Sequence, residues 1–539
     1  MELAQEIVLE GNEGKPHRSQ TLLSAEPMGL EVSLLEVEVH CSSGLPRVDI
    51  VGLAETCVRE SKQRVRAAIL ASGLKFPDSK ITINLVPPSV KKTGTGIDLA
   101  IALGILLSDG KIKMADSDIL KNLLFLGECS LSGKLRPIKG ILNVVLTARE
   151  KGLYEIVLPI QNAKEASLVS GLTLFPAVSL NEVIQFIERK NVLPSIKTSH
   201  LIAQKKEKNS TTTDHHYHLA NIKGQSLGKD ALILAVSGGH NLLFVGPPGS
   251  GKTLLAKSLC SILPKLSEKE AMEVTRIHSC AGILHGREQI VQFPPFRFPH
   301  HSISDAGFIG GGKYLHPGEL SLAHHGVLFL DELPEFKRNV LESLREPLES
   351  GMVILSRAQG FVQYPAQFQL VAAMNPCPCG YWGSKDYLCR CSPVMIRNYT
   401  KKISGPLLDR IDIRVFVHQV SHEDFFQKSE SPKYSLDELK RTIQRARERQ
   451  KNRYQKEMFW KNAEIPPSLM GKYCVLTPKG KKVLMKNMEK KCISARAVHR
   501  ILRLAKTLGD LKKEDPKEVL DEDLIYEALN FWQISDSWN

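Results

Sequence analysis

The sequence predicts an α/β protein built from several domains, and three observations support that prediction. Its 539 residues exceed the length that one hydrophobic core usually organises. Short apolar runs alternate with helical stretches through most of the chain, which is typical of sheets covered by helices. After residue 421 the sequence becomes helical and rich in Lys, Arg, Leu and Glu. We therefore expect two α/β domains followed by a helical domain.

Shifts in composition and periodicity set the predicted domain boundaries. The predicted segments are a polar tail (1–20), an α/β domain (21–194), a polar linker (195–215), a parallel-sheet domain (216–421) and a basic helical domain (422–539). In the first α/β domain, the apolar pattern predicts strands over 36–39 and 80–85 and helices over 55–72 and 98–107. The short, continuous apolar runs of the second domain favour a parallel sheet that is buried on both faces.

The composition limits the class of protein. The hydrophobic content of 42% suits globular domains, no segment approaches a membrane span, and the first thirty residues lack a signal-peptide pattern. We therefore expect a cytoplasmic protein without membrane segments. The 11 cysteines are an odd number, and four of them lie within fifteen residues, which favours reduced thiols and a metal site over a disulfide framework.

The positive charge is concentrated in one region. Between Lys433 and Asp510 the excess of Lys and Arg over Asp and Glu is as large as the formal net charge of the whole chain, +14. A concentrated positive field is suited to a nucleic-acid backbone. Solvated faces of a helical domain would produce the same composition, so charge alone leaves both interpretations open.

A phosphate-binding loop is the most specific motif. The apolar run 241–245 leads into Gly246-Pro-Pro-Gly-Ser-Gly-Lys252-Thr253, the pattern G-x-x-x-x-G-K-[ST], and then into a helix. Lys252 supplies positive charge to the β and γ phosphates of a nucleotide, and the hydroxyl of Thr253 can bind Mg²⁺. The predicted phosphate contacts are Gly246, Pro247, Pro248, Gly249, Ser250, Gly251, Lys252 and Thr253. We therefore predict that ATP and Mg²⁺ bind here.

Two further apolar runs end in polar residues suited to the same site. The run 326–330 is followed by Asp331 and Glu332, a Walker B pattern in which the aspartate faces Mg²⁺ and the glutamate polarises the attacking water. The run 369–374 ends at Asn375. Ligands of open α/β sheets bind at the carboxyl ends of the strands, so these side chains are expected to meet the phosphate loop.

Two arginines are candidates for stabilising the transferred phosphoryl group. Arg410 lies in the segment 404–412, and Arg496 lies in 494–500, on a predicted C-terminal helix. A guanidinium can neutralise charge on the γ-phosphoryl group, from within the same chain or from a neighbouring subunit. A surface or ion-pair role would fit either arginine equally well on spacing alone.

The cysteine-rich segment predicts a structural metal site. Cys377, Cys379, Cys389 and Cys391 offer four thiols from two short arms, which is enough for one tetrahedral Zn²⁺. Four thiolates leave no open coordination position, so a catalytic zinc is not expected. The alternative is a loop of four reduced cysteines without metal.

These motifs belong to longer stretches with a family resemblance. The segments 218–225, 238–253, 296–302, 318–324, 331–336, 404–413 and 494–511 resemble those of the magnesium-chelatase-like branch of AAA+ ATPases. Over about residues 20–535 the chain resembles the bacterial ComM (YifB) competence family. The resemblance implies that Asn375 is the sensor 1 residue, Arg410 an arginine finger acting in trans, and Arg496 the sensor 2 arginine of a helical lid.

The resemblance also implies a homo-hexameric ring with DNA inside it, and recombination proteins as partners. Two segments are candidate strand contacts: a glycine-rich loop with Lys313, and a predicted hairpin over 352–363 with Arg357 near its tip. Cations on loops suit phosphate tracking without sequence readout. An ordinary surface loop and hairpin remain the alternative.

The N-terminal domain resembles the proteolytic domain of Lon proteases, most clearly over 124–141. Peptidases of that family use a Ser–Lys dyad, but the serine position falls within Thr93-Gly-Thr-Gly96 and the lysine position at Leu142. Nearby Thr95 has no aligned base. We therefore expect a non-proteolytic domain, and the loop 91–96 also departs from the pattern of ComM relatives.

Together these features predict an ATP-driven DNA helicase that promotes branch migration when incoming single strands are integrated by homologous recombination. One rival is a motor subunit that inserts Mg²⁺ into a tetrapyrrole, which shares the AAA+ core. That rival has no need of a Lon-like domain or of the basic region. A second rival is an ATP-dependent protease, which would need the missing dyad.

Overall fold

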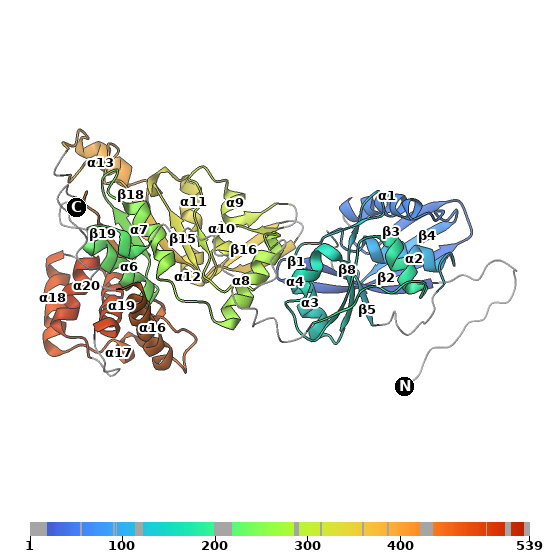
Figure 1. Cartoon of the computed structure of the whole chain (residues 1–539). Coiled ribbons are helices and arrows are strands. Elements are labelled where there is room, and N and C mark those ends of the chain that lie inside the picture. The colour runs from blue at the N-terminus through green and yellow to red at the C-terminus, as the bar shows by residue number, and fades with distance from the viewer. Residues whose placement is uncertain are drawn as a thin grey trace. The chain divides into compact units, whose positions relative to one another are not determined.

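The computed structural model describes residues 19–53, 56–89, 92, 94–113, 122–198, 218–284, 290–312, 315–357, 360–384, 387–420, 435–491, 493–512 and 519–532. They form two compact units, one built mainly from residues up to 205 and the other mainly from residues 206 onward (Figure 1). Each unit has its own hydrophobic core. The mixed α/β architecture that the sequence predicts is confirmed.

The N-terminal unit is organised around an eight-stranded mixed sheet with the order β10-β9-β8-β5-β1-β2-β4-β3. Its strands are β1 (Ser19–Met28), β2 (Glu31–Ser42), β3 (Arg47–Val51), β4 (Lys80–Val86), β5 (Leu123–Phe125), β8 (Glu155–Pro159), β9 (Thr173–Ala177) and β10 (Ile196–Lys197). Strands β1 and β2 form an antiparallel hairpin, whereas β1, β5, β8 and β9 run parallel to one another. A short hairpin of β6 (Glu128–Cys129) and β7 (Leu135–Arg136) lies outside this sheet.

Five helices accompany this sheet in the part of the unit that the structure describes (Figure 1). They are α1 (Thr56–Ala71), α2 (Asp98–Ser108), α3 (Ile141–Glu150), α4 (Ile160–Ala166) and α5 (Leu180–Ile187). Every residue of α2 is buried, which explains its almost continuous apolar sequence. A Cβ on Gly104 would lie 2.6 Å from Cγ2 of Val39, so glycine allows the helix to approach the sheet closely.

The second unit contains a five-stranded parallel sheet with the order β12-β15-β18-β11-β19. Its strands are β12 (Phe296–Arg297), β15 (Val327–Leu330), β18 (Gln369–Met374), β11 (Leu242–Val245) and β19 (Ile413–Phe416). All residues of β11, β15 and β18 are buried, as their continuous apolar sequences predict. Strand β18 separates β11 from β15, so the strands that end at Val245, Leu330 and Met374 are consecutive neighbours.

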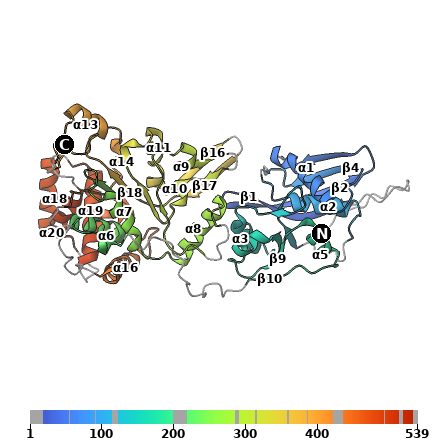
Figure 2. The same cartoon turned by 45° about the horizontal axis from the view of Figure 1, so that its top comes forward.

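Helices surround this sheet and continue into the C-terminal region (Figure 1). The helices of the sheet region are α6 (Ser226–Gly238), α7 (Lys252–Ser258), α8 (Glu268–Ala281), α9 (Asp305–Ile309), α10 (Glu319–Leu322), α11 (Arg338–Ser343), α12 (Pro347–Ser350), α13 (Pro393–Thr400) and α14 (Gly405–Leu408). The C-terminal helices are α16 (Leu436–Arg453), α17 (Met470–Tyr473), α18 (Pro478–Lys491), α19 (Ala495–Lys512) and α20 (Glu522–Trp532). Helices α16 and α19 pack against α6 (Figure 2).

A buried polar network joins the C-terminal helices to the sheet. His240, which precedes β11, places Nε2 2.8 Å from Oγ1 of Thr507 on α19 and Nδ1 3.5 Å from Oδ2 of Asp412. Asp510, one turn along α19, accepts hydrogen bonds from Arg453 of α16 and, at 2.8 Å, from Nδ2 of Asn462. Buried polar groups stabilise a fold only when they are paired, and this network pairs them across the two regions.

The predicted strands and helices agree with the structure, whereas the predicted start of the linker does not. The strands predicted over 36–39 and 80–85 lie in β2 and β4, and the predicted helices correspond to α1 and α2. The linker predicted to begin at 195 includes Ile196 and Lys197, which instead form β10 and pair with β9. A two-residue edge strand has no periodicity to detect. Among the described residues, no helix is both long enough and apolar enough to cross a membrane.

Candidate functional site

The predicted phosphate loop joins the carboxyl end of β11 to the start of α7. Gly249 and Gly251 have φ values of 74° and 87°, in the left-handed region that favours glycine. A Cβ on Gly246 would lie 2.2 Å from the carbonyl oxygen of Val417, so only glycine fits at the first position. Pro247 and Ser250 are buried, whereas Pro248 is exposed with Gly249. The loop therefore has the backbone conformation expected of a phosphate cradle.

Lys252 begins α7, and its ammonium group lies under the loop. Its Nζ donates to the carbonyl oxygens of Gly246 and Pro247 at 2.7 and 2.8 Å and to Oδ1 of Asn375 at 3.2 Å. Burial lowers the pKa of Lys252 to about 8, although the nearby carboxylates of Asp331 and Glu332 raise it. A bound phosphate would add negative charge beside this ammonium and favour its protonated form.

Thr253 and Asp331 meet as the sequence predicts. Oγ1 of Thr253 donates to Oδ2 of Asp331 at 2.6 Å, and Oδ1 of Asp331 accepts from the backbone N–H of Glu332 at 3.0 Å. Asp331 directly follows β15, so its carboxylate lies at the same sheet edge as the phosphate loop. A hydroxyl and a carboxylate side by side are oxygen ligands of the kind that Mg²⁺ prefers. These two residues therefore fit the predicted Mg²⁺ site.

Glu332 has an unusual backbone and an exposed carboxylate. Its φ of 51° is uncommon for a residue with a side chain, and such conformations cluster at functional sites. The side chain is 57% exposed, and its Oε2 lies 3.5 Å from Nδ1 of His301. The carboxylate is thus accessible to water beside the phosphate loop, where a water-polarising group is needed.

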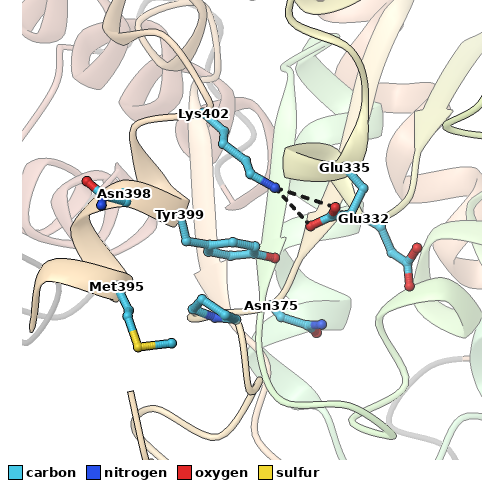
Figure 3. Close-up of a pocket in the computed structure, with 8 residues that line it drawn as sticks. Glu332, Glu335, Asn375, Met395, Asn398, Tyr399 and Lys402 are labelled. Atoms are coloured by element: carbon cyan, nitrogen blue, oxygen red, sulfur yellow. Dashed lines mark hydrogen bonds and ion pairs between the residues drawn. The ribbon is translucent and has the colours of Figure 1, made fainter. Parts of the chain in front are cut away.

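A cavity of about 510 Å³ opens beside Glu332 and Asn375 (Figure 3). The other lining residues are Glu335, Pro378, Met395, Asn398, Tyr399 and Lys402. Nζ of Lys402 lies 3.4 Å from Oε1 of Glu335, and Figure 3 shows this ion pair among the residues that line the cavity. The sequence did not mark Tyr399 or Lys402 as site residues, because they lie in no motif and only tertiary packing brings them here. His301 lies within the family-like segment 296–302, but nothing in that segment indicates that it lies beside Glu332.

The two candidate arginines differ in their surroundings. Arg410 follows α14, where Nη1 donates to the carbonyl oxygen of Pro406 at 2.8 Å and Nη2 pairs with the exposed carboxylate of Glu349. Arg496 is exposed on the first turn of α19. The hydrogen bonds described for Arg410 do not lead to the phosphate loop of its own chain. Its predicted role in trans therefore stays a prediction, as does the role of Arg496.

The predicted DNA contacts can be placed only in part. Strands β16 (Met352–Arg357) and β17 (Gly360–Pro365) form a two-stranded sheet, which confirms the predicted hairpin with Arg357 at the end of its first strand. Lys313 and the side chain of Arg357 lie outside the described part of the chain. Their contact with DNA stays a prediction.

The four cysteines of the segment 377–391 converge on one point. The Sγ atom of Cys377 lies 3.3 Å from that of Cys379 and 3.7 Å from that of Cys389, and all four Sγ atoms lie within 4.8 Å of one another. Tetrahedral zinc with Zn–S bonds of about 2.3 Å places its sulfur ligands about 3.8 Å apart. Burial raises the pKa of the Cys379 thiol, but hydrogen bonds from Tyr381 and Arg390 lower it, to about 6 overall. The cluster therefore fits a structural Zn²⁺.

A second cluster, His324, His325 and Glu273, fits a hydrogen-bonded network better than a metal site. Nδ1 of His324 accepts from the backbone N–H of Gln367 at 3.1 Å, so the neutral ring carries its proton on Nε2, 3.3 Å from Oε2 of Glu273. A protonated nitrogen cannot bind a metal. His325 places Nε2 2.8 Å from the same carboxylate oxygen. We assign this cluster a structural role.

In the N-terminal unit, the residues nearest the missing dyad do not form one. The hydroxyl of Thr95 donates to the carboxylate of Glu128, and Leu142 is fully buried in α3. Lys92 is buried, and its Nζ donates to the carbonyl oxygen of Leu85 at 2.9 Å. The described contacts thus pair Thr95 with a carboxylate and not with an amine.

Three neighbouring parallel strands carry a phosphate loop, an acidic pair and an asparagine at their carboxyl ends, and C-terminal helices pack beside them. This arrangement defines a P-loop ATPase of the AAA+ class. Comparison with known proteins narrows the class. The chain belongs to the ComM/YifB family of magnesium-chelatase-like proteins.

Several relatives match almost the whole chain, and two of them illustrate the similarity. Competence protein ComM of Haemophilus influenzae is 39% identical over 512 residues, covering 94% of this chain and 97% of that protein. The uncharacterized protein YifB of Escherichia coli is 37% identical over 505 residues, covering 93% of this chain and 96% of that protein. The magnesium-chelatase 38 kDa subunit of Cereibacter sphaeroides is 26% identical over 171 residues, covering 29% of this chain and 51% of that protein.

Three protein families match separate segments. Residues 218–425 match magnesium chelatase, subunit ChlI, and residues 434–531 match the C-terminal part of that subunit. Residues 37–162 match subunit ChlI of Mg-chelatase, within the segment for which the sequence predicts a Lon-like fold. The first two matches cover the sheet region and the C-terminal helices that carry the predicted nucleotide site.

Proposed function

We propose that this protein is an ATP-driven DNA motor, a helicase that promotes branch migration when incoming DNA recombines with the chromosome during natural transformation. One observation carries the proposal: the relative named for competence matches 94% of this chain, including the segments outside the ATPase region. The ATPase chemistry is supported separately by the geometry around Lys252.

The described side chains divide the hydrolytic chemistry among them. Lys252 lies where its ammonium can bind the β and γ phosphates, and Thr253 with Asp331 can hold Mg²⁺, which neutralises phosphate charge when bound. Glu332 lies beside them and can accept a proton from the attacking water. Asn375, within 3.2 Å of Lys252, can orient that water or the γ-phosphate. Most of the rate enhancement would come from positioning and charge stabilisation.

The proposal includes a homo-hexameric ring. In such a ring Arg410 would approach the γ-phosphate bound by the neighbouring subunit, and Arg496 would act from the C-terminal helices. Lys313 and Arg357 would contact DNA in the ring, and the basic region between Lys433 and Asp510 would add phosphate contacts. We further propose that the protein acts in the cytoplasm with recombination proteins as partners.

We also propose a structural zinc ion at the cysteine cluster. The support is geometric: three of the distances between sulfur atoms, 3.3, 3.6 and 3.7 Å, are close to those of a tetrahedral tetrathiolate site. The thiols would bind the ion as thiolates, and no sulfur would be displaced by substrate.

A motor subunit for Mg²⁺ insertion into a tetrapyrrole is the second candidate. It is favoured by the family matches over residues 218–425 and 434–531, whose descriptions name a magnesium-chelatase subunit. The chelatase subunit compared above, however, matches only 29% of this chain. The match of the competence protein over nearly the whole chain favours the DNA motor.

The proposal is tested by ATP turnover and by strand exchange on synthetic four-way junctions. We expect DNA to stimulate ATP hydrolysis, and we expect the full chain to move the junction with ATP but not with a non-hydrolysable analogue. The Glu332→Gln variant is the matched control, since it keeps the phosphate loop intact. If DNA does not change the rate of ATP hydrolysis and the junction does not move, the proposed DNA motor is wrong. Turnover stimulated by a chelatase partner complex would favour the second candidate.

A further inference from the structure

The cysteine cluster is attached directly to the strand that carries the sensor residue. Strand β18 ends at Met374, Asn375 follows it, and Cys377 is only two residues further on. Asn375 in turn places Oδ1 3.2 Å from Nζ of Lys252. The position of the first metal ligand therefore constrains the position of the asparagine at the nucleotide site.

A second contact connects the cluster with the phosphate loop itself. Gly380 lies between the two cysteine arms with a φ of 86°, and its backbone N–H donates to the carbonyl oxygen of Cys377 at 3.0 Å. A Cβ at this position would lie 2.6 Å from Cδ of Pro248 and 3.8 Å from Cγ of Asn375. Pro248 belongs to the phosphate loop. The turn after Cys377 thus packs against the loop that would hold the nucleotide, with no space for a side chain.

A third contact comes from the far end of the cluster. Helix α13 begins at Pro393, two residues after Cys391, and Ser392 caps it by accepting from the backbone N–H of Met395 at 3.3 Å. On this helix Tyr399 lines the same cavity as Asn375. Figure 3 shows the Tyr399 ring beside Asn375 at the wall of the cavity. Both ends of the cysteine segment therefore lead to residues at the same cavity wall, Asn375 and Tyr399.

From these contacts we propose that the cysteine cluster, with Zn²⁺ bound by its four thiolates, is a structural clamp of the nucleotide site, so that zinc occupancy sets the rate of ATP hydrolysis. The clamp acts through the Gly380–Pro248 contact and through the short chain segment that joins Asn375 to Cys377. Without the ion, four thiols within 4.8 Å have only weak hydrogen bonds to hold two arms together. The inference rests on the proposed ATPase function.

The first experiment uses the full chain with its metal removed. We measure zinc content by mass spectrometry, the affinity for a fluorescent ATP analogue, and ATP turnover, before and after chelation and after Zn²⁺ is added back. We expect about one zinc per chain and, because misplacement by 1 Å can cost about 100-fold in rate, a turnover about 100-fold lower without zinc. Zn²⁺ should restore the turnover, which a chain that had merely unfolded irreversibly would not allow.

Two cysteine variants separate the cluster from the other thiols. Cys389→Ser removes one ligand and should lower zinc content and turnover together. Cys260→Ser is the matched control, because Cys260 is an exposed free cysteine outside the cluster and should leave both unchanged. Full zinc content in Cys389→Ser, or chelated protein that turns over ATP at the parent rate, would overturn the proposal.

A glycine pair tests the mechanical contact without touching the metal ligands. Gly380→Ala should keep its zinc but turn over ATP at least about tenfold more slowly, because the new Cβ must displace Pro248. Gly73→Ala is the control: Gly73 has a φ of 80°, but a Cβ there would meet no atom within 4 Å. If Gly380→Ala hydrolyses ATP at the parent rate, the Gly380–Pro248 contact does not control turnover.

The outcomes also distinguish this inference from the proposed function. If the zinc-loaded chain hydrolyses no ATP under any condition, the proposed ATPase function fails. The affinity for the ATP analogue then decides the inference: a lower affinity after zinc removal supports the clamp, and an unchanged affinity overturns it.

Discussion

His324 gives a quantitative prediction about the stability of the second unit. Its ring is 2% exposed, and it packs against His325 with ring centroids 3.8 Å apart and faces Glu273 of α8. Burial, together with the positive charges of His325 and Lys461, lowers the pKa of His324 to about 4, although the carboxylate of Glu273 raises it. The ring therefore stays neutral in the folded protein at pH values where an exposed histidine accepts a proton.

The direction and size of the effect follow from the two pKa values. The unfolded chain protonates His324 near its ordinary pKa of 6.5, whereas the folded chain does so only near 4. Between these values the unfolded state binds more protons, so stability falls as the pH falls. From pH 6.5 to pH 4.5 the loss of free energy of unfolding is about 2 kcal/mol. The pKa values of Glu270 and Glu273 are lowered from 4.5 in the folded protein, so the stability that these carboxylates contribute is lost mainly below pH 4.5.

Tryptophan fluorescence can isolate the relevant unit. All four tryptophans, Trp382, Trp460, Trp532 and Trp538, lie in the segment assigned to the second unit. We expect urea unfolding of His324→Gln to lose about 2 kcal/mol less than the parent between pH 6.5 and 4.5, since glutamine keeps a donor for Glu273 without titrating. His300→Gln, at an exposed histidine, is the control. Parallel pH curves for the parent and His324→Gln would refute the reasoning.

Three further predictions concern the sites. Lys252→Ala should weaken binding of a fluorescent ATP analogue, because the ammonium predicted to contact the phosphates is lost. Glu332→Gln should bind the analogue and accumulate rings in sedimentation while hydrolysis stops, and hydrolysis at the parent rate would show that the glutamate is not needed for catalysis. Arg410→Ala should keep binding but lose about 10³- to 10⁵-fold in turnover, and mixing it with Lys252→Ala subunits should recover part of the activity if the arginine acts in trans. The full chain should not degrade casein with ATP, because Thr95 is paired with a carboxylate; measurable cleavage would contradict the non-proteolytic prediction.

Local sequence was sufficient for much of the nucleotide site. The phosphate loop was predictable because its glycines and its lysine act through backbone geometry within eight residues, and the buried strands because each is a continuous apolar run. The hairpin of β16 and β17 follows from alternation around a turn. In these cases the residues that determine the structure are neighbours in the chain.

Contacts between distant segments were not predictable in the same way. His240 meets Thr507 across 267 positions, and His324 meets Glu273 across 51, so no periodicity of a single segment reports either pair. The packing of Gly380 against Pro248 likewise depends on how the turn after β18 folds back. From the sequence alone, Gly380 cannot be distinguished from an ordinary loop glycine. The sequence therefore predicts the candidate site residues better than it predicts the long-range contacts that position them.

The surroundings of Arg410 are compatible with its predicted role as an arginine finger for a neighbouring subunit. Its guanidinium is 19% exposed and pairs with Glu349, whose side chain is 72% exposed. An ion pair with so exposed a carboxylate contributes only about 0–1 kcal/mol. A γ-phosphate carries more charge than one carboxylate, so exchanging Glu349 for the phosphate of a neighbouring subunit would cost little and gain more. Glu349 would thus keep the arginine in position between encounters, and Glu349→Gln should leave turnover at the proposed interface intact while Arg410→Ala abolishes most of it.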